Sequence, residues 1–354
     1  MDKIIFFATL VLFPFGQLFK IGFVNLFDVS VLLLAVITIF KKPKYPEWYR
    51  YFIYFIIASL FSLLVNYKLF EIKSLLYLVR LFSYSYVAIY VFNNHKNHLT
   101  LNLQLLAIST ASAVLGWTQY ILWPDLTSLK YFGWDDHLLR MVGTFLDPTY
   151  LGLILVLGII IGIQYKYKKL VYLLLFSLAF TYSRSSYFIV SLFLLFKKQN
   201  IALIFFTLVI LFLPKNIGEG TNLARTVSAN NKLTNYSETW QIFKKSPVYG
   251  IGFNNMCKAR QLYLGDTNVE SHACNGSDSS ILFLLATTGI IGMILFVNYV
   301  LSIMYYANHN LYSTLLNSSF IVVLLHSLFS NSLFYPHIMF WIFALIGLKT
   351  KSDR

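Results

Sequence analysis

The chain has 354 residues, of which 58% are hydrophobic and 12% are charged, and its mean hydropathy is +0.66. Because a soluble domain carries about a quarter charged residues, this composition excludes an ordinary soluble protein and predicts an all-α polytopic membrane protein. Despite a net charge of +14, we expect membrane lipids rather than nucleic acid as the surroundings of this chain.

Apolar runs recur from one end of the chain to the other. A transmembrane helix needs roughly 20 apolar residues, so these runs predict about 12 transmembrane helices, with 11 to 13 as the expected range. The runs cover residues 3–19, 21–40, 51–66, 74–92, 99–122, 149–165, 170–183, 185–196, 201–214, 279–300, 313–330 and 335–348.

Lys and Arg are unevenly shared between the segments that connect these runs. Because short cytoplasmic loops carry an excess of Lys and Arg, we place both termini and the richer segments in the cytoplasm. The richer segments hold Lys3, Lys41, Lys42, Lys44, Arg50, Lys96, Lys166, Lys168, Lys169, Lys197, Lys198, Lys349, Lys351 and Arg354. The poorer side holds Lys20, Lys68, Lys73, Lys130, Arg140 and Arg184.

One arginine, Arg184, interrupts the apolar stretch 170–196. A single helix over this stretch would put the cations at its two ends on opposite sides of the membrane, against the charge rule. We therefore expect two short helices that meet at an outward-facing turn with Arg184 at its apex. A structural arginine bonded to backbone carbonyls at a helix break is the alternative, and the tendency of intramembrane charges to be functional favours a binding role.

The topology divides the chain into five segments. Two of them, the outer loops, are large enough to contain an active site. The sequence has no Walker loop, GxGxxG, HExxH or CxxC pattern. We therefore expect no metal and no cofactor. The segments are an N-terminal transmembrane bundle (1–122), a first outer loop (123–148), helices with the Arg184 turn (149–214), a large outer loop (215–278) and C-terminal transmembrane helices (279–354).

Four motifs in order resemble the superfamily of O-antigen polymerases and O-antigen ligases. They are GTFLDPTYLG (143–152), TYSRSS (181–186), the stretch from Arg225 through Trp240 to PVYGIGFNNM (247–256), and DSSILFLLATTGIIG (278–292). The resemblance covers roughly residues 140–295. It implies a GT-C-like membrane glycosyltransferase in the bacterial inner membrane, with its active site on the periplasmic side.

The resemblance also implies the substrate, an oligosaccharide on undecaprenyl diphosphate. Guanidinium groups bind phosphate bidentately and stay charged, so the leaving diphosphate calls for arginine. Arg184 and Arg225 occupy the two arginine positions of the family and are the catalytic candidates. Chain length can be set by a separate regulator protein.

One departure from the family pattern distinguishes between its two activities. The ligase-like His-Asn pair falls here on Asp278 and Ser279, with His272 six residues earlier. The missing histidine favours a repeat-unit polymerase over a ligase that passes the chain to lipid A-core or protein. Asp278 becomes the candidate base or a carboxylate that orients the sugar. A flippase or transporter is the third reading; it expects internal repeats and little outer loop.

The remaining candidates are expected to contact substrate. Arg80, inside an apolar run, lines a lipid groove or snorkels to the outer surface. Gly250 and Gly252 fit a tight turn, and Gly289 fits close helix packing. Cys257 and Cys274 could form a disulfide, although their spacing alone does not show it. The substrate-binding candidates are Arg80, Arg140, Asp147, Trp240 and His272, with Asp135, Asp136 and His137 as further groups able to bond sugar hydroxyls.

Overall fold

The computed structural model describes residues 1–21, 24–95, 97–215, 217–266, 268, 272–308 and 313–348. The fold is mostly helical, with one two-stranded antiparallel ribbon of β1 (Lys20–Ile21) and β2 (Val24–Asn25). The α-helices are α1 (Asp2–Leu12), α2 (Leu26–Phe40), α3 (Tyr49–Val65), α4 (Ile72–Asn94), α5 (His98–Leu122), α6 (Pro148–Gln164), α7 (Lys168–Ala179), α8 (Arg184–Phe196), α9 (Asn200–Phe212), α10 (Val227–Lys245), α11 (Met256–Leu264), α12 (Ser280–Asn308), α13 (Ser313–His326) and α14 (Pro336–Ile346). The 3-10 helices are η1 (Phe13–Phe15), η2 (Tyr67–Leu69), η3 (Thr127–Phe132), η4 (Gly143–Phe145), η5 (Glu219–Thr221), η6 (His272–Asn275) and η7 (Ser332–Phe334).

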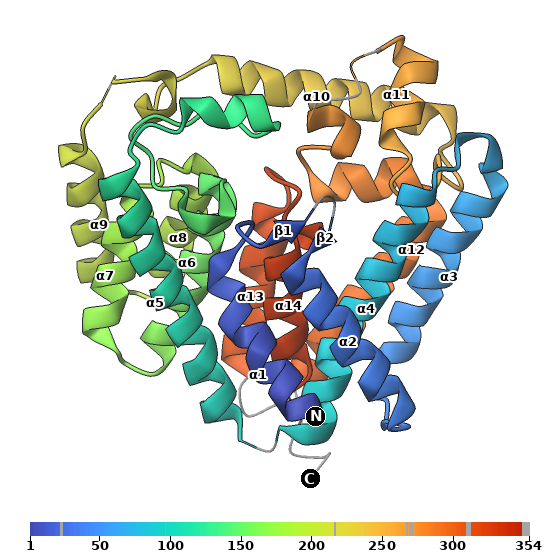
Figure 1. Ribbon diagram of the computed structural model, residues 1–354, viewed down its shortest axis with the longest axis horizontal. Coiled ribbons are helices and arrows are strands. Elements are labelled where there is room, and N and C mark those ends of the chain that lie inside the picture. Colours follow the sequence, from blue (N-terminus) through green and yellow to red (C-terminus); the bar gives the residue numbers. More distant parts are fainter. Residues whose placement is uncertain are drawn as a thin grey trace. The chain divides into compact units, whose positions relative to one another are not determined.

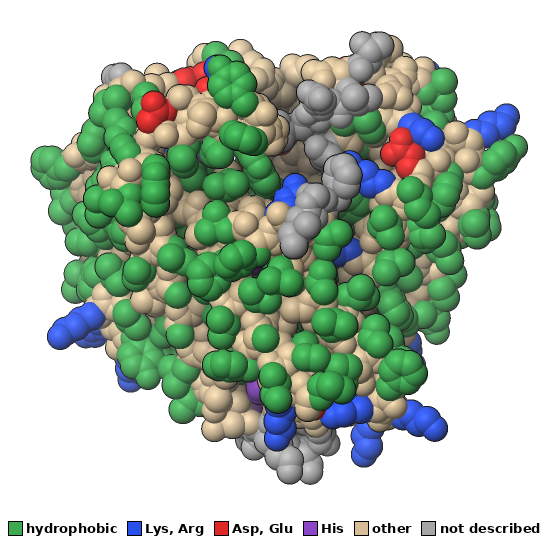
Figure 2. All heavy atoms as spheres, in the orientation of Figure 1, with side chains coloured by type: hydrophobic (Ala, Val, Ile, Leu, Met, Phe, Trp, Pro, Cys, Tyr) green, Lys and Arg blue, Asp and Glu red, His purple; other side chains and the backbone are tan. Residues whose placement is uncertain are grey.

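Each predicted apolar run overlaps one of these helices, and α10 and α11 lie in the segment 215–278, which is predicted to be an outer loop. Among the described residues, α4, α5 and the part of α12 from Ser280 to Ala307 are long and apolar enough to cross a membrane. Seven further apolar helices, α2, α3, α6, α8, α9, α13 and α14, have 10–17 residues. Hydrophobic side chains are spread over the face shown in Figure 2, as expected for helices surrounded by lipid. Twelve membrane spans stay a prediction.

The chain forms two compact units from segments that alternate along the sequence. Unit 1 comprises Met1–Leu33, His95–Arg225 and Ser318–His326, and unit 2 comprises Leu34–Asn94, Thr226–Asn317 and Ser327–Arg354. The five segments predicted from the sequence are divided by membrane topology, whereas these two units are divided by packing. The five segments stay a prediction. Lys96, Lys349, Lys351 and Arg354, which contribute to the predicted orientation, lie outside the described residues.

Unit 1 is built around α6. This helix packs against α5, α7 and α8, which are drawn with it in shades of green in Figure 1. Glycines on α6 make the close approach possible, because a Cβ on Gly158 would collide with Ser109 of α5, and one on Gly152 would lie 2.6 Å from the Ser186 hydroxyl of α8. Small residues spaced along a helix allow such approach in membranes, where packing drives association.

In unit 2, α12 packs along α3, and α4 packs against α14 (Figure 1). A loop from the same unit packs against α12 at the point where this helix is broken. Gly289, inside α12, has a left-handed φ of 67°, so the helix cannot continue its hydrogen-bond ladder there. The loop 247–252 supplies the missing partners: Ile251 N donates to Ala286 O at 3.0 Å, and Ile290 N donates to Pro247 O at 2.9 Å.

The glycines of this loop have the predicted turn conformation. Gly250 has φ +71° and Gly252 has φ +94°, which confirms a tight turn. The expectation that Gly289 serves packing between helices is wrong in detail, because a Cβ on Gly289 would meet the loop backbone at Val248 and Gly250. The Ser62 hydroxyl of α3 completes the junction: it lies 2.8 Å from Thr287 O and accepts from Gly252 N at 3.0 Å. We call the loop 247–252 with the α12 break the glycine junction.

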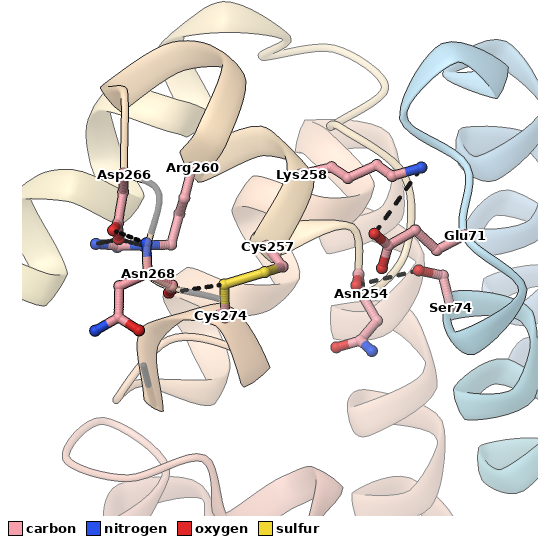
Figure 3. Close-up of a disulfide and its surroundings, with 9 residues drawn as sticks. All are labelled: Glu71, Ser74, Asn254, Cys257, Lys258, Arg260, Asp266, Asn268 and Cys274. Atoms are coloured by element: carbon pink, nitrogen blue, oxygen red, sulfur yellow. Dashed lines mark hydrogen bonds and ion pairs between the residues drawn. A yellow bond between two sulfur atoms is a disulfide. The ribbon is translucent and has the colours of Figure 1, made fainter. Parts of the chain in front are cut away.

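The two cysteines are joined in a disulfide that ties α11 to η6 (Figure 3). Arg260 of α11 lies beside it and bridges two acids: its guanidinium is 2.8 Å from Glu238 of α10 and 2.9 Å from Asp266. The backbone N–H of Asn268 and the charge of Arg260 lower the pKa of Asp266. Across α11, Lys258 reaches Glu71 at 3.9 Å. Covalent and ionic links therefore hold α10, α11 and η6 together within unit 2.

Removal of this disulfide should destabilise the large outer loop. Cross-linking Cys257 to Cys274, 17 positions apart, restricts the unfolded chain and contributes about 3 kcal/mol in the chain-entropy model. We expect the double variant Cys257→Ser/Cys274→Ser to lower the thermal midpoint of the purified protein and to speed proteolysis within 257–274. Wild-type protein under reducing conditions should behave like the variant. Equal midpoints for oxidised wild type and variant would contradict the prediction.

Candidate functional site

The stretch 170–196 forms two helices joined by a turn, as predicted. α7 ends at Ala179 and α8 begins at Arg184. Within the turn, Tyr182 has a left-handed φ of 50°, and its hydroxyl donates to Pro214 O at 2.7 Å, which ties the turn to the end of α9. The Thr181 hydroxyl donates to Leu178 O and accepts from Ser183 N, so the side chain replaces bonds that the helix loses here. The turn is a fixed feature of unit 1.

Arg140 is inserted against this turn from the first outer loop. Its side chain is buried, and its Nε and Nη2 both donate to Thr181 O at 3.2 Å, with a weaker contact from Nη2 to Tyr182 O at 3.4 Å. Its backbone is held as well, because the next residue, Met141, donates from N to Phe180 O at 2.9 Å. Arg140 therefore joins the first outer loop to the Arg184 turn.

Arg225 and Arg184 approach the same turn and are half-buried. Arg225 Nη2 donates to Tyr182 O at 3.3 Å, and its Nη1 donates to Gly220 O at 2.9 Å. Arg184 Nη1 in turn donates to the backbone carbonyl of Arg225 at 2.8 Å. Three guanidinium groups, from three segments far apart in the sequence, thus meet at the turn 181–184. We call Arg140, Arg184 and Arg225 the arginine cluster.

The arginine cluster concentrates positive charge. Burial, followed by the charge of Arg225, lowers the pKa of Arg140 to about 10. Burial, followed by the charge of Arg184, lowers the pKa of Arg225. Arg140 and Arg225 still carry their protons at neutral pH, so the repulsion between them persists and is relieved by an entering anion. Asp147, Asp135 and Glu219 offset part of this repulsion.

His137 lies next to the cluster in a buried position. Its side chain is 6% exposed, and neither ring nitrogen has a hydrogen-bond partner among the described residues. Burial and the charge of Arg140 lower its pKa, against the opposing charges of Asp147, Asp135 and Asp136. The imidazole is therefore neutral at pH 7, and one ring nitrogen can accept a proton.

A further residue that positions the cluster is Gln119, near the end of α5. Its Oε1 accepts from Val142 N at 3.0 Å and from Gly143 N at 3.1 Å, and its Nε2 donates to Trp123 O. These bonds fix the backbone next to Arg140. Sequence reasoning missed this role; the only signal is a polar side chain close to the end of the apolar run 99–122.

Asp147 has a structural contact in addition to its predicted role. Its Oδ1 accepts from Thr149 N at 2.6 Å and from Tyr150 N at 3.4 Å, which caps the N-terminus of α6. Contact with a sugar hydroxyl stays a prediction for Asp147. Its charge favours the protonated forms of His137 and Arg140, so it also belongs to the electrostatics of the cluster.

The other predicted residues lie in unit 2. Trp240 of α10 is 44% exposed, and its ring packs against that of Phe243 with the two ring centroids 5.0 Å apart. Asp278 precedes α12, and its backbone N–H donates to Asn235 at 2.9 Å. His272 begins η6, and its side chain lies outside what the structure describes. Arg80 of α4 lines a pocket with Tyr77 and other residues of this unit. Substrate contact by these residues stays a prediction.

The burial of His137 predicts a pH dependence. Because its pKa is lower in the folded state than the ordinary value of 6.5, the unfolded state binds the proton more readily. Stability should therefore fall as the pH drops below about 6.5. We expect His137→Gln to flatten the fall of the thermal midpoint between about pH 7 and pH 5, measured by tryptophan fluorescence. Parallel curves for variant and wild type would contradict this.

Comparison with known families adds to this geometry. Residues 149–297 match the family model described as O-Antigen ligase, and no curated protein matches the chain. The matched stretch includes Arg184, Arg225 and the glycine junction, whereas Arg140 and His137 precede it. Residues 149–297 therefore form an O-antigen ligase-like domain, which is consistent with the superfamily of O-antigen polymerases and ligases that the four motifs resemble.

Proposed function

We propose that this protein is an O-antigen polymerase that joins undecaprenyl-diphosphate-linked oligosaccharide repeat units at the periplasmic face of the inner membrane. The observation that carries the proposal is the arginine cluster: three guanidinium groups within the hydrogen-bonding network of one turn. Guanidinium groups carry the charge opposite to that of a diphosphate and can bind phosphate oxygens bidentately.

In the proposed reaction, a hydroxyl oxygen of the acceptor sugar attacks the anomeric carbon of the donor chain. The bond from that carbon to the diphosphate oxygen breaks, and its electron pair leaves with undecaprenyl diphosphate. Negative charge grows on the leaving group, so fixed guanidinium groups stabilise the transition state more than the ground state. The diphosphate linkage supplies the driving force, and we expect no metal or cofactor.

The acceptor hydroxyl must lose a proton to a base. His137 supports this role because it is neutral at pH 7, lies next to Arg140 and has both ring nitrogens without a partner among the described residues. Asp278, at the family's histidine position, is the base expected from the sequence. Arg80, Trp240 and His272 remain proposed substrate contacts.

A ligase is the second candidate, because the matching family model is described as O-Antigen ligase. The replacement of the family's His-Asn pair by Asp278 and Ser279 favours the polymerase. We further propose twelve membrane spans in a GT-C-like fold, with both termini in the cytoplasm and the arginine cluster outside. A separate protein that regulates chain length is a proposed partner.

The two activities leave different products in a strain that lacks this protein. Loss of a polymerase leaves core bearing a single repeat unit and no longer ladder on a polysaccharide gel. Loss of a ligase removes the single-unit band as well, and lipid-linked polymer accumulates. We expect the first pattern, restored by the wild-type gene. The second pattern would contradict the polymerase and establish the ligase, and an unchanged ladder would contradict both.

A further inference from the structure

A buried chain of polar side chains adjoins the Arg184 turn in unit 1. At the end of α13, Nε2 of His326 lies 3.3 Å from the hydroxyl of Ser186 in α8, and this hydroxyl lies 2.9 Å from that of Ser183. His326 and Ser186 are 0% exposed, and Ser183 is 3% exposed. Because a buried polar group that loses its partner is costly, these contacts hold the three side chains together. We call them the His326 chain.

Ser183 departs from the ordinary use of a serine at the start of a helix. A serine in this position usually accepts a hydrogen bond from a backbone N–H of the first turn. Ser183 is the N-cap of α8, but its hydroxyl makes no such bond with the described residues. It contacts the hydroxyls of Ser186 and, at 3.4 Å, Ser185. The side chains of the first turn are therefore oriented by the His326 chain rather than by helix capping.

The His326 chain holds one face of the first turn of α8. Ser183 and Ser186 are three residues apart and share this face, whereas Arg184 leaves from another face, because successive residues are separated by about 100°. The serine face lies against α6, where a Cβ on Gly152 would be 2.6 Å from the Ser186 hydroxyl. With this face held, Arg184 Nη1 reaches the carbonyl of Arg225 at 2.8 Å. A change in the serine contacts would rotate or tilt the turn and move the Arg184 guanidinium.

We propose that His326 is a positioning residue for Arg184. It acts through the hydroxyls of Ser186 and Ser183, which hold the first turn of α8 so that the Arg184 guanidinium meets the diphosphate in one fixed geometry. A misplacement of about 1 Å can lower a rate about 100-fold, even when the changed residue is remote from the reacting atoms. The role rests on the proposed function, in which Arg184 binds the leaving diphosphate.

Steady-state kinetics of the purified full-length protein with lipid-linked single repeat units test this role. We expect His326→Ala to lower kcat/KM about 10-fold to 100-fold at a temperature where the variant is folded. His326→Gln, whose amide can replace the contact of Nε2 with Ser186, should recover most of the activity. Ser186→Ala removes a single oxygen atom from the same chain and should lower kcat/KM in the same way. The double variant should be no worse than the poorer single variant, because both changes break one chain.

The Arg184→Lys background separates positioning from general damage. The guanidinium geometry is already lost there, so His326→Ala should lower kcat/KM less than about threefold in that background. Ser109→Ala is a matched control, because Ser109 of α5 is a buried serine that lies against Gly158 of α6 as Ser186 lies against Gly152. This variant should keep the wild-type kcat/KM.

Two results would overturn the proposal. One is full activity of His326→Ala or of Ser186→Ala, and the other is an equal loss from His326→Ala in the wild-type and Arg184→Lys backgrounds. Arg184→Ala distinguishes this failure from a failure of the proposed function. An inactive Arg184→Ala beside a fully active His326→Ala refutes only the positioning role, whereas a fully active Arg184→Ala refutes the diphosphate site itself.

Discussion

Arg184→Ala should abolish polymerisation in cells at normal protein levels. Arg184 is half-buried in the turn between α7 and α8, and it is bonded to the backbone of Arg225 within the arginine cluster. Loss of one fixed hydrogen-bond donor that stabilises a developing anion costs about 100-fold to 1,000-fold in rate. A strain complemented with this variant should show core with a single repeat unit and no ladder.

Two further variants separate charge from geometry. Arg184→Lys keeps the charge but not the planar bidentate donor, so we expect partial restoration with shorter chains. Arg50→Ala, which changes an exposed residue at the start of α3 in unit 2, should restore the full ladder. A normal ladder with Arg184→Ala would refute a role in diphosphate binding and would leave Arg184 as a structural arginine.

Gly250→Ala should be severely destabilising. Gly250 has a left-handed φ, and a Cβ there would lie 2.5 Å from both Thr287 O and Thr288 N of the α12 break. A left-handed backbone conformation costs an L-residue about 1–2 kcal/mol, and the clash with a backbone that cannot move adds to this cost. We therefore expect the free energy of unfolding to fall by more than about 3 kcal/mol. The variant should show a strongly lowered thermal midpoint in detergent and reduced abundance in membranes.

Gly133 and Gly265 provide controls with the same backbone conformation. Both have left-handed φ values, +77° and +69°, but a Cβ at either position meets no atom of the described residues within 4 Å. Alanine at either position should lower the free energy of unfolding only by the cost of the left-handed conformation, about 1–2 kcal/mol. If Gly250→Ala is no worse than Gly265→Ala, then the glycine junction does not depend on close backbone approach.

Helices and turns were predictable where a local signal exists. The apolar runs locate the helices, since length and composition decide where a lipid-facing helix forms. The charge rule split 170–196 at Arg184, and the structure has the turn there. Gly250 and Gly252 indicate their turn because few other residues adopt such backbone conformations. In each case, the determining chemistry lies within a few residues.

Features that depend on distant contacts were not predictable from the sequence. The role of Gly289 arises from a loop that returns to α12, and the role of Gln119 arises from the loop that follows α5. The convergence of Arg140 with Arg225 depends on the carbonyl of Tyr182 as a shared acceptor. The protonation state of His137 depends on its burial, and a loop sequence that is rich in charged residues does not reveal this burial.

The most direct test is the reaction of the purified protein with undecaprenyl-diphosphate-linked single repeat units as the only substrate. We expect lipid-linked products of two and more units, released undecaprenyl diphosphate in equal measure to the bonds formed, and no such products from Arg184→Ala. If wild-type protein leaves the single units unjoined and, in a parallel reaction supplied with lipid-linked polymer and lipid A-core, transfers the polymer to the core, the polymerase account is wrong and the protein is a ligase.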